Sequence, residues 1–328
     1  MKSDKHHRSK DKVKAQEGIS WAVADLLAAP DDITNARDLL AHNLTQLSKS
    51  ASARLMIKEA AEQGWRIGLS RLEQHDFHLD VPSKTIILDN HGMSAENIFR
   101  APYFNHALQL SILRSLRDAW QEKRHGGFDE NYMPESVLLL ERIRAADGDI
   151  VALFAAWELR GEHDGLWRHA AASGDSDIAL ALSNCLEKDP ACMNRALAAA
   201  FRQWFGEPRR VNACDHETLE YMDEVLNAHQ GAAFGRKRAG KICIEVLSCL
   251  PDKTAYLRGL GEDILSDPLY AGLSDPINQT HFMHVMRDAS VCYVQNVPFR
   301  DASLAAKIFP NGEMTPERPE HEEVKQRF

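Results

Sequence analysis

The sequence predicts a predominantly helical α+β fold, in which a small sheet near the N-terminus precedes two long paired helices and a helical array. Three observations predict it. Short strand-like segments broken by polar turns lie within residues 64–90, and two long helical patterns lie within residues 105–160. After residue 160, short helical patterns alternate with Pro or Gly. The chain has 328 residues and 44% hydrophobic content, which is enough for a substantial core.

Composition excludes several classes of protein. The formal net charge of −9 gives no reason to expect binding to nucleic acid or to a membrane surface. No apolar run reaches the roughly 18 to 20 residues of a membrane span, and the N-terminus lacks the apolar core of a signal peptide. The six cysteines form no C-x-x-C pair, which is typical of reduced thiols. We therefore expect a cytoplasmic protein.

The N-terminal part begins with a basic segment, residues 1–15, which is poor in apolar side chains and predicted to be a disordered tail. From residue 19 to 60, apolar residues recur at helical spacing and predict three helices, the first starting around Trp21. The segments GWRIGLS, DFHLDV and KTIILDN, all within residues 64–90, predict two or three strands. Ser94 is a candidate N-cap for the helix that follows.

The paired helices of residues 105–160 are the centre of the predicted fold. The first has one apolar stripe with a residue every fourth position: Leu108, Ile112, Leu116 and Trp120. Arg114 and Asp118 lie together on the opposite, polar face. Pro134 suits the first turn of the second helix. Within that helix, Asp147 lies at the centre of an apolar stripe, where a carboxylate needs a partner.

Residues 161–310 predict short helices with short connections, which make a bundle or irregular array packed on the preceding part. Asp215 and Asp252 each precede a helical pattern and are candidate N-caps. We find no fixed-period repeat, so a regular solenoid is not predicted. Residues 311–328 are rich in Pro and Glu and predict a loose tail.

The segments SLRDAWQ and RIRAADGD, one on each paired helix, resemble a bacterial family of uncharacterised, zincin-like metallopeptidases. In that family the first helix usually reads H-E-x-x-H-A-W-Q, and the second carries an acidic residue after an Arg. The resemblance extends loosely from about residue 64 to 289 and is close at residues 119–121. It implies a zincin-like domain over residues 16–160, with the sheet beside the active-site helix.

The zinc motif itself is degenerate, because the H-E-x-x-H frame falls on Arg114, Ser115, Leu116, Arg117 and Asp118. In the intact motif two imidazoles converge on zinc, and the Glu takes a proton from the metal-bound water. Arg114 has no lone pair to give, and Ser115 is not a base at neutral pH. Asp118 and Asp147 alone would form a site with few ligands, all of them hard oxygen donors, which is not typical of zinc. We therefore expect neither zinc nor another cofactor.

An ion-pair cluster offers a physical reading of the degenerate site, which comprises Arg114, Ser115, Asp118 and Asp147. Arg114 and Asp118, four residues apart, can pair directly. If the helices pack as the resemblance implies, Arg114 also reaches Asp147 and puts a fixed positive charge where the metal's charge would be. The alternative is that Arg114 and Asp118 form an ordinary solvated pair and Asp147 merely flanks its stripe.

Three functions remain open, in order of preference. The first is a catalytically inactive metallopeptidase-like protein that acts as a protein-binding or regulatory module, with no assigned catalytic residue. The second is an active metal-dependent peptidase with displaced ligands, drawn from Asp118, Asp147, Asp149, His281 and His284. The third is a helical adaptor with no peptidase ancestry, which the absence of a sheet beside the 105–122 helix would favour. The first implies a protein partner, whose identity the sequence does not reveal.

Overall fold

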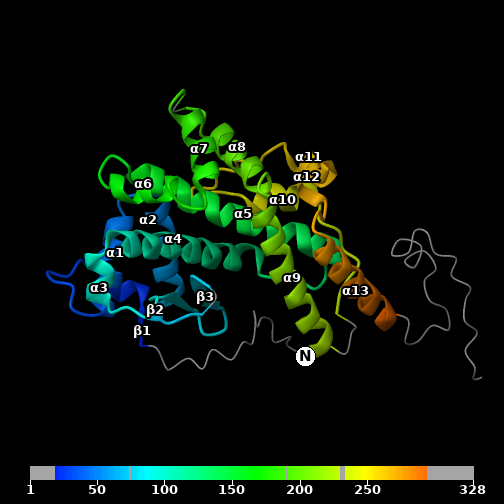
Figure 1. Ribbon diagram of the computed structural model, residues 1–328, viewed down its shortest axis with the longest axis horizontal. Coiled ribbons are helices and arrows are strands. Elements are labelled where there is room, and N and C mark those ends of the chain that lie inside the picture. The colour runs from blue at the N-terminus through cyan, green and yellow to red at the C-terminus, as the bar shows by residue number, and fades with distance from the viewer. Residues whose placement is uncertain (1–18, 74, 190, 230–232, 294–328) are drawn as a thin grey trace, which may run out of the picture.

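The computed structural model describes residues 19–293 except 74, 190 and 230–232. Within this part of the chain, helices dominate and the only strands form one small sheet (Figure 1). The predicted class, α+β and predominantly α, is therefore confirmed. The tails predicted at residues 1–15 and 311–328 lie outside the described residues.

One long helix, α4 (Pro102–His125), runs through the middle of the molecule. Strands of the sheet contact it on one side, and a second long helix, α5 (Pro134–Leu159), packs along it on another (Figure 1). The two helices follow each other in the chain and run in opposite directions. Residues far apart in sequence therefore face each other across the α4–α5 contact.

Among the described residues the sheet has four strands in the order β1-β2-β4-β3, namely β1 (Ser20–Ala22), β2 (Arg66–Ser70), β4 (Thr85–Asp89) and β3 (Phe77–Asp80). The central strands β2 and β4 pair in parallel, with Ile67 opposite Ile86, and both outer pairings are antiparallel. Strands β3 and β4 contact α4. The strands predicted within residues 64–90 are thus confirmed, and they lie beside the predicted helix.

The first element differs from the prediction. Where the sequence predicts a helix from about Trp21, residues 20–22 form an edge strand on β2, and one 3₁₀ turn, η1 (Val23–Leu26), follows. Val23 and Leu26 are both fully buried and lie three residues apart. One 3₁₀ turn therefore satisfies the same apolar spacing as a longer helix. Apolar spacing over so short a run does not distinguish the two.

The next three helices follow the predicted pattern: α1 (Ala36–Leu47), α2 (Ala51–Gln63) and α3 (Ala95–Arg100). Each begins at a polar residue whose side chain accepts a hydrogen bond from a backbone N–H, namely Asn35, Ser50 and Ser94. Ser94 therefore has the capping role that the sequence predicts. Gly64 ends α2 with a φ of +77°, a backbone conformation that favours glycine, and the chain enters β2.

The paired helices are more deeply buried than their amphipathic pattern predicts. Pro134 begins α5 as expected. The four consecutive side chains of residues 150–153 are fully buried, so α5 is covered on every side. On α4 the face predicted to be polar is covered as well, since only 18% of the Arg114 side chain and 8% of Asp118 are exposed. The alternative of an ordinary solvated Arg114–Asp118 pair is therefore wrong.

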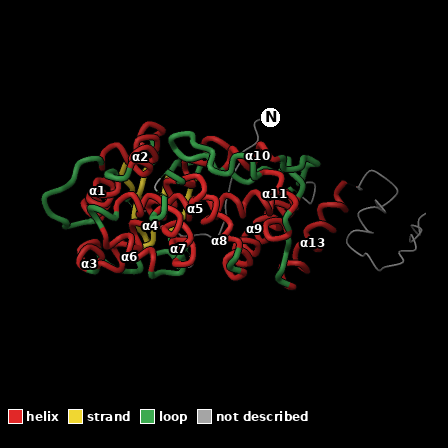
Figure 2. The backbone as a smooth tube through the Cα atoms, turned by 90° about the horizontal axis from the view of Figure 1, so that it is seen from above, coloured by secondary structure: helices red, strands yellow, loops and turns green. Residues whose placement is uncertain are grey.

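Helices also make up the rest of the described chain: α6 (Asp164–Ala171), α7 (Ser176–Leu186), α8 (Met193–Phe205), α9 (Pro208–Ala228), α10 (Lys241–Leu247), α11 (Gly261–Ser266), α12 (Pro268–Ala271) and α13 (Pro276–Tyr293). Each helix from α6 to α10 contacts α5. Figure 2 shows strands in one half of the molecule and only helices and loops in the other. None of the described helices combines the length and the hydropathy required to cross a membrane.

Both helix caps predicted in the C-terminal part are wrong. Asp215 lies inside α9, which begins seven residues earlier at Pro208 and is capped by Glu207. Asp252 caps a turn, where its carboxylate accepts a hydrogen bond from the Thr254 N–H, and no helix begins there. An Asp before an apolar pattern marks a cap only if its side chain has no stronger partner. Asp215 has one in Arg142.

A fully buried ion pair ties α5 to the C-terminal helices. Arg142 on α5 donates to both oxygens of Asp215 on α9, with a distance of 2.7 Å from Nη2 to Oδ2. The Arg142 Nη1 donates to the Tyr270 carbonyl oxygen on α12 at 2.7 Å. Neither charged side chain is exposed. One guanidinium therefore holds three helices together.

We predict that Asp215→Ala lowers the free energy of unfolding by roughly 3 to 5 kcal/mol, because it leaves the Arg142 charge buried without its partner. Urea denaturation measures this. The double variant Arg142→Met/Asp215→Leu recovers most of the loss, since both charges are then absent. Asp164→Ala serves as the control, because it breaks an exposed pair with Arg168 and costs less than about 1 kcal/mol. An equal loss in Asp215→Ala and the control would contradict the prediction.

Candidate functional site

The first position of the zinc frame, Arg114, lies between two carboxylates. Its Nε donates to Asp149 Oδ1 on α5 at 2.7 Å, and its Nη2 donates to Asp175, the residue before α7. The second oxygen of Asp149 accepts a hydrogen bond from the Trp204 indole on α8, at 2.9 Å. The Arg114 cluster, defined as Arg114, Asp149, Asp175 and Trp204, therefore joins four helices.

The charges of the Arg114 cluster depend on one another. Burial lowers the pKa of the Arg114 guanidinium, but Asp149 and Asp175 outweigh burial and raise the pKa overall. Burial also raises the pKa of Asp175, and so does the neighbouring charge of Asp149, while Arg114 and Arg210 oppose them. Arg114 is thus a permanent cation, and it separates two carboxylates that would otherwise repel each other.

Asp147 pairs with Arg117 instead of the predicted Arg114. The Arg117 Nε and the Gln121 amide both donate to Asp147 Oδ2, at 2.6 and 2.5 Å, and the Tyr256 hydroxyl donates to Oδ1 at 2.8 Å. Burial raises the pKa of Asp147, and these three donors oppose that effect. The carboxylate has the buried partner that the sequence predicts, but the prediction names the wrong arginine.

The packing of the two helices explains this difference. Because α4 and α5 run in opposite directions, a residue earlier on α4 meets a residue later on α5. Arg117 therefore reaches Asp147, while Arg114, almost one turn earlier, reaches Asp149. Gln121 lies four residues after Arg117 and so faces the same carboxylate. The i,i+4 spacing of Arg117 and Gln121 was the available sequence signal for this site.

The two other candidate positions on α4 are buried. Ser115 is fully buried, and its hydroxyl donates to the Ile112 carbonyl oxygen at 3.0 Å. Asp118 is 8% exposed. The Ser115 hydroxyl donates its proton to a backbone carbonyl of its own helix and not to a base. Ser115 is therefore not an activated nucleophile.

Positive charge gathers at the C-terminal end of α4. The guanidinium carbons of Arg117 and Arg124 lie 4.1 and 3.6 Å from the Trp120 ring centroid. Burial, followed by the charges of Arg144, Arg117 and Arg124, lowers the pKa of His125 to about 4. The Arg117 Nη1 has no hydrogen-bond partner among the described residues and is held against the indole. His125 is therefore neutral near pH 7.

The residues present at the frame do not fit zinc, which needs thiolate, imidazole or carboxylate ligands. Arg114 offers only N–H donors, and two of its nitrogens already bind carboxylates. In the described ranges, no group of three or more His, Cys, Asp or Glu side chains is arranged to hold a metal ion. Of the proposed displaced ligands, His281 on α13 pairs with Asp223 at 2.7 Å, and His284 is exposed.

The low pKa of His125 predicts that stability falls in acid. Between the ordinary value of 6.5 and the folded value of about 4, the unfolded chain binds a proton that the folded chain does not. The free energy of unfolding therefore decreases as pH falls through this range. In His125→Gln the slope of this free energy against pH is smaller, by an amount equivalent to up to about one bound proton. Denaturation at several pH values measures it, with the exposed His284→Gln as control. Equal slopes in wild type and His125→Gln would contradict this.

Comparison with known proteins identifies the family of the chain. No curated protein and no solved structure matches the chain. Residues 20–257, well over half of the chain, match the family described as "Putative metallopeptidase family (DUF6782)". The matched residues contain the whole sheet, α4 and α5. The chain therefore belongs to this metallopeptidase family.

Proposed function

We propose that this family member is catalytically inactive and serves as a protein-binding or regulatory module. The observation that carries the proposal is the position of Arg114. Its guanidinium stands at the first histidine of the H-E-x-x-H frame and binds carboxylates from α5 and from the start of α7. An arginine supplies the positive charge of a metal ion, but it cannot coordinate a water molecule and lower its pKa to make a nucleophile.

Burial of the frame supports the same proposal. A zinc peptidase needs an open coordination position and a Glu beside it. Here the Glu position is Ser115, which is fully buried. The second position of the frame thus has neither the chemistry nor the solvent access of a catalytic base.

The carboxylates around Arg114 also account for how the fold keeps its shape without a metal. Asp149 and Asp175 approach one cation from two helical segments, and Trp204 binds Asp149 from a third. A guanidinium with two carboxylates and an indole donor satisfies the polar groups that a vacated metal site would leave unpaired. The cluster is therefore a structural substitute for a metal centre.

The alternatives have less support. Family membership and the contact between the sheet and α4 do not fit a helical adaptor of unrelated ancestry. The displaced-ligand peptidase requires Asp147 and Asp149, which already bind Arg117 and Arg114. We also propose a protein partner and a cytoplasmic location. The formal net charge of −9 and the scattered free cysteines support these proposals.

The test is the metal content of protein purified without added zinc, measured beside the variant Arg114→His/Ser115→Glu/Asp118→His. We predict no stoichiometric metal in the wild type and about one zinc per chain in the triple variant, since a restored frame supplies two imidazoles. Adding Asp149→Asn to the triple variant removes the zinc, because this carboxylate is the nearest candidate third ligand. Plasma mass spectrometry on dialysed protein measures each value.

A matched control places histidines with the same spacing on an exposed helix face. Arg54→His/Lys58→His on α2 puts two imidazoles at i and i+4 in solvent, beside the exposed Glu62 but away from partly buried carboxylates such as Asp149 and Asp175, and is expected to retain no zinc through dialysis. Stoichiometric metal in the wild type overturns the proposal. Equal zinc in the control and in the triple variant means that the frame is not the remnant of a metal site.

A further inference from the structure

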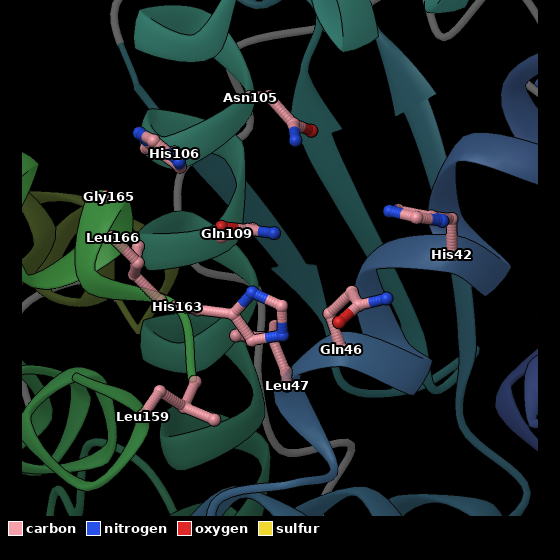
Figure 3. A pocket seen from close by; sticks show the side chains of 10 residues that line it. All are labelled: His42, Gln46, Leu47, Asn105, His106, Gln109, Leu159, His163, Gly165 and Leu166. Carbon is pink, nitrogen blue, oxygen red and sulfur yellow. The ribbon is translucent and has the colours of Figure 1, made fainter. Parts of the chain in front are cut away.

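A cavity of about 340 Å³ lies apart from the Arg114 cluster, near the start of α4. Its walls are α1, the first turns of α4 and the segment that joins α5 to α6 (Figure 3). Three histidines line it: His42, His106 and His163. Three leucines form its apolar part: Leu47, Leu159 and Leu166. The cavity is thus large enough for a small organic molecule and has both polar and apolar walls.

The amide groups of the cavity are held in a defined orientation by Asn43, which is fully buried on α1. Asn43 donates to Asn105 Oδ1 at 3.0 Å and accepts from Gln109 Nε2 at 2.9 Å. The Asn105 nitrogen therefore remains a donor, and the Gln109 oxygen remains an acceptor. Figure 3 shows both side chains projecting from α4 toward α1. The Asn105 and Gln109 amides are therefore oriented by Asn43 in the absence of a ligand.

The protonation of His163 follows from its contact with Lys49. The Lys49 ammonium lies 3.0 Å from His163 Nε2, and an ammonium can only donate. Nε2 is therefore the acceptor, and in the neutral ring Nδ1 carries the proton. In Figure 3 the His163 ring lies between Gln109 and Gln46. It thus adds an N–H donor beside the fixed amides.

One polar atom of the cavity lacks a partner. The Gln46 Oε1 is buried and has no hydrogen-bond partner among the described residues. A buried acceptor without a donor costs roughly 1 to 3 kcal/mol, so such atoms are rare unless a ligand or water completes them. We therefore expect the molecule that fills the cavity to carry a hydrogen-bond donor for Gln46 Oε1 and Gln109 Oε1.

The charge of the cavity favours an anion. No Asp or Glu is among its described lining residues, and the Lys49 ammonium lies 3.0 Å from the lining His163. Glu162, which lies 3.7 Å from Lys49, is 67% exposed. Burial lowers the pKa of His42 and His163, and the charge of Lys49 lowers both further.

From these contacts we propose that the cavity binds a small aliphatic carboxylate with a hydroxyl or amino group on the adjacent carbon, that is, a 2-hydroxy or 2-amino acid. The carboxylate meets Lys49, the His163 N–H and the Asn105 amide. A hydroxyl donates to Gln46 Oε1, an amino group donates to Gln46 Oε1 and to Gln109 Oε1, and the aliphatic part contacts the leucines. This site uses no residue of the Arg114 cluster, so it stands independently of the proposed function.

Binding takes up protons. An anion in the cavity favours the charged imidazolium of His42 and His106, so affinity increases as pH falls through their lowered pKa values. His163 keeps Nε2 unprotonated as the acceptor for Lys49. The groups that face these histidines are Lys49 for His42 and His163, His169 on α6 and His163 for His106, and His42 for His163. Glu162 acts in the opposite direction on His163.

Calorimetric titration of the full chain tests the proposal with four compounds: 2-hydroxy-4-methylpentanoate, leucine, 4-methylpentanamide and inorganic phosphate. We expect one site for the hydroxy acid or for leucine, with affinity several-fold higher near pH 6 than near pH 7.5 and net proton uptake in paired buffers. The amide lacks both the charge and the group on the adjacent carbon, and it binds at least about tenfold more weakly. Phosphate lacks the aliphatic part and is also weaker.

Three variants locate the site. His163→Gln and Lys49→Met each weaken the acid by about tenfold, because each removes a donor or charge at the carboxylate. Gly165→Ala also weakens binding, since a Cβ there would lie 2.8 Å from His106 Cε1 and push the ring. Matched controls are His216→Gln and Lys58→Met, both in exposed pairs elsewhere, and they leave the affinity unchanged.

Four outcomes overturn the proposal. They are equal binding of acid and amide, tighter binding of phosphate than of either acid, binding that His163→Gln and Lys49→Met leave unchanged, and no binding of either acid at either pH. Circular dichroism of each variant verifies folding. Because Lys49 is a partly exposed side chain, Lys49→Met retains the fold and keeps the test decisive if His163→Gln unfolds.

Discussion

The structure depends on the burial of charge between α4 and α5. Arg117 and Asp147 face each other with no exposure at all, and the Arg114–Asp149 pair lies almost one turn further along the same contact. A buried charge without a partner costs several kcal/mol, so a shift of one helix along the other would be strongly unfavourable. The ion pairs thus determine the register of the two helices. The surrounding segments then supply the remaining donors, including Tyr256, in the turn after α10, for Asp147 and Trp204 on α8 for Asp149.

Three arginines of α4 and α5 bind four aspartates, and each arginine reaches a different part of the chain. Arg114 joins α4 to α5 and α7, Arg117 joins α4 to α5 and to the Cys249 carbonyl, and Arg142 joins α5 to α9 and α12. Apolar residues of the same volume often give equal or greater stability than such pairs. The ion pairs contribute specificity here, because each guanidinium binds only acceptors that lie along the directions of its planar N–H groups.

The sequence predicts the fold class, the strands within residues 64–90 and the start of α5 at Pro134, since these follow from local periodicity and from the fixed φ of proline. It also predicts that Asp147 has a buried partner. It does not predict which arginine binds Asp147, because Arg114 and Arg117 lie on α4 within one turn, and only the position of α5 separates them. The Asp175 contact and the histidine cavity depend on segments brought together from α1, α4 and the α6 region. No local pattern encodes such proximity.

The complete covering of α5 has a consequence for synthesis of the chain on the ribosome. The sheet, α2 and α4 emerge first, and α5 follows with residues 150–153 apolar on every side. Its other face stays uncovered until α8 and α9 have been translated, because those helices contact it in the finished molecule. A nascent chain halted near residue 160 would therefore expose an apolar, aggregation-prone surface on α5. Such an intermediate is expected to bind chaperones. Splitting the gene after α5 would yield two fragments that aggregate when expressed separately and fold only when expressed together.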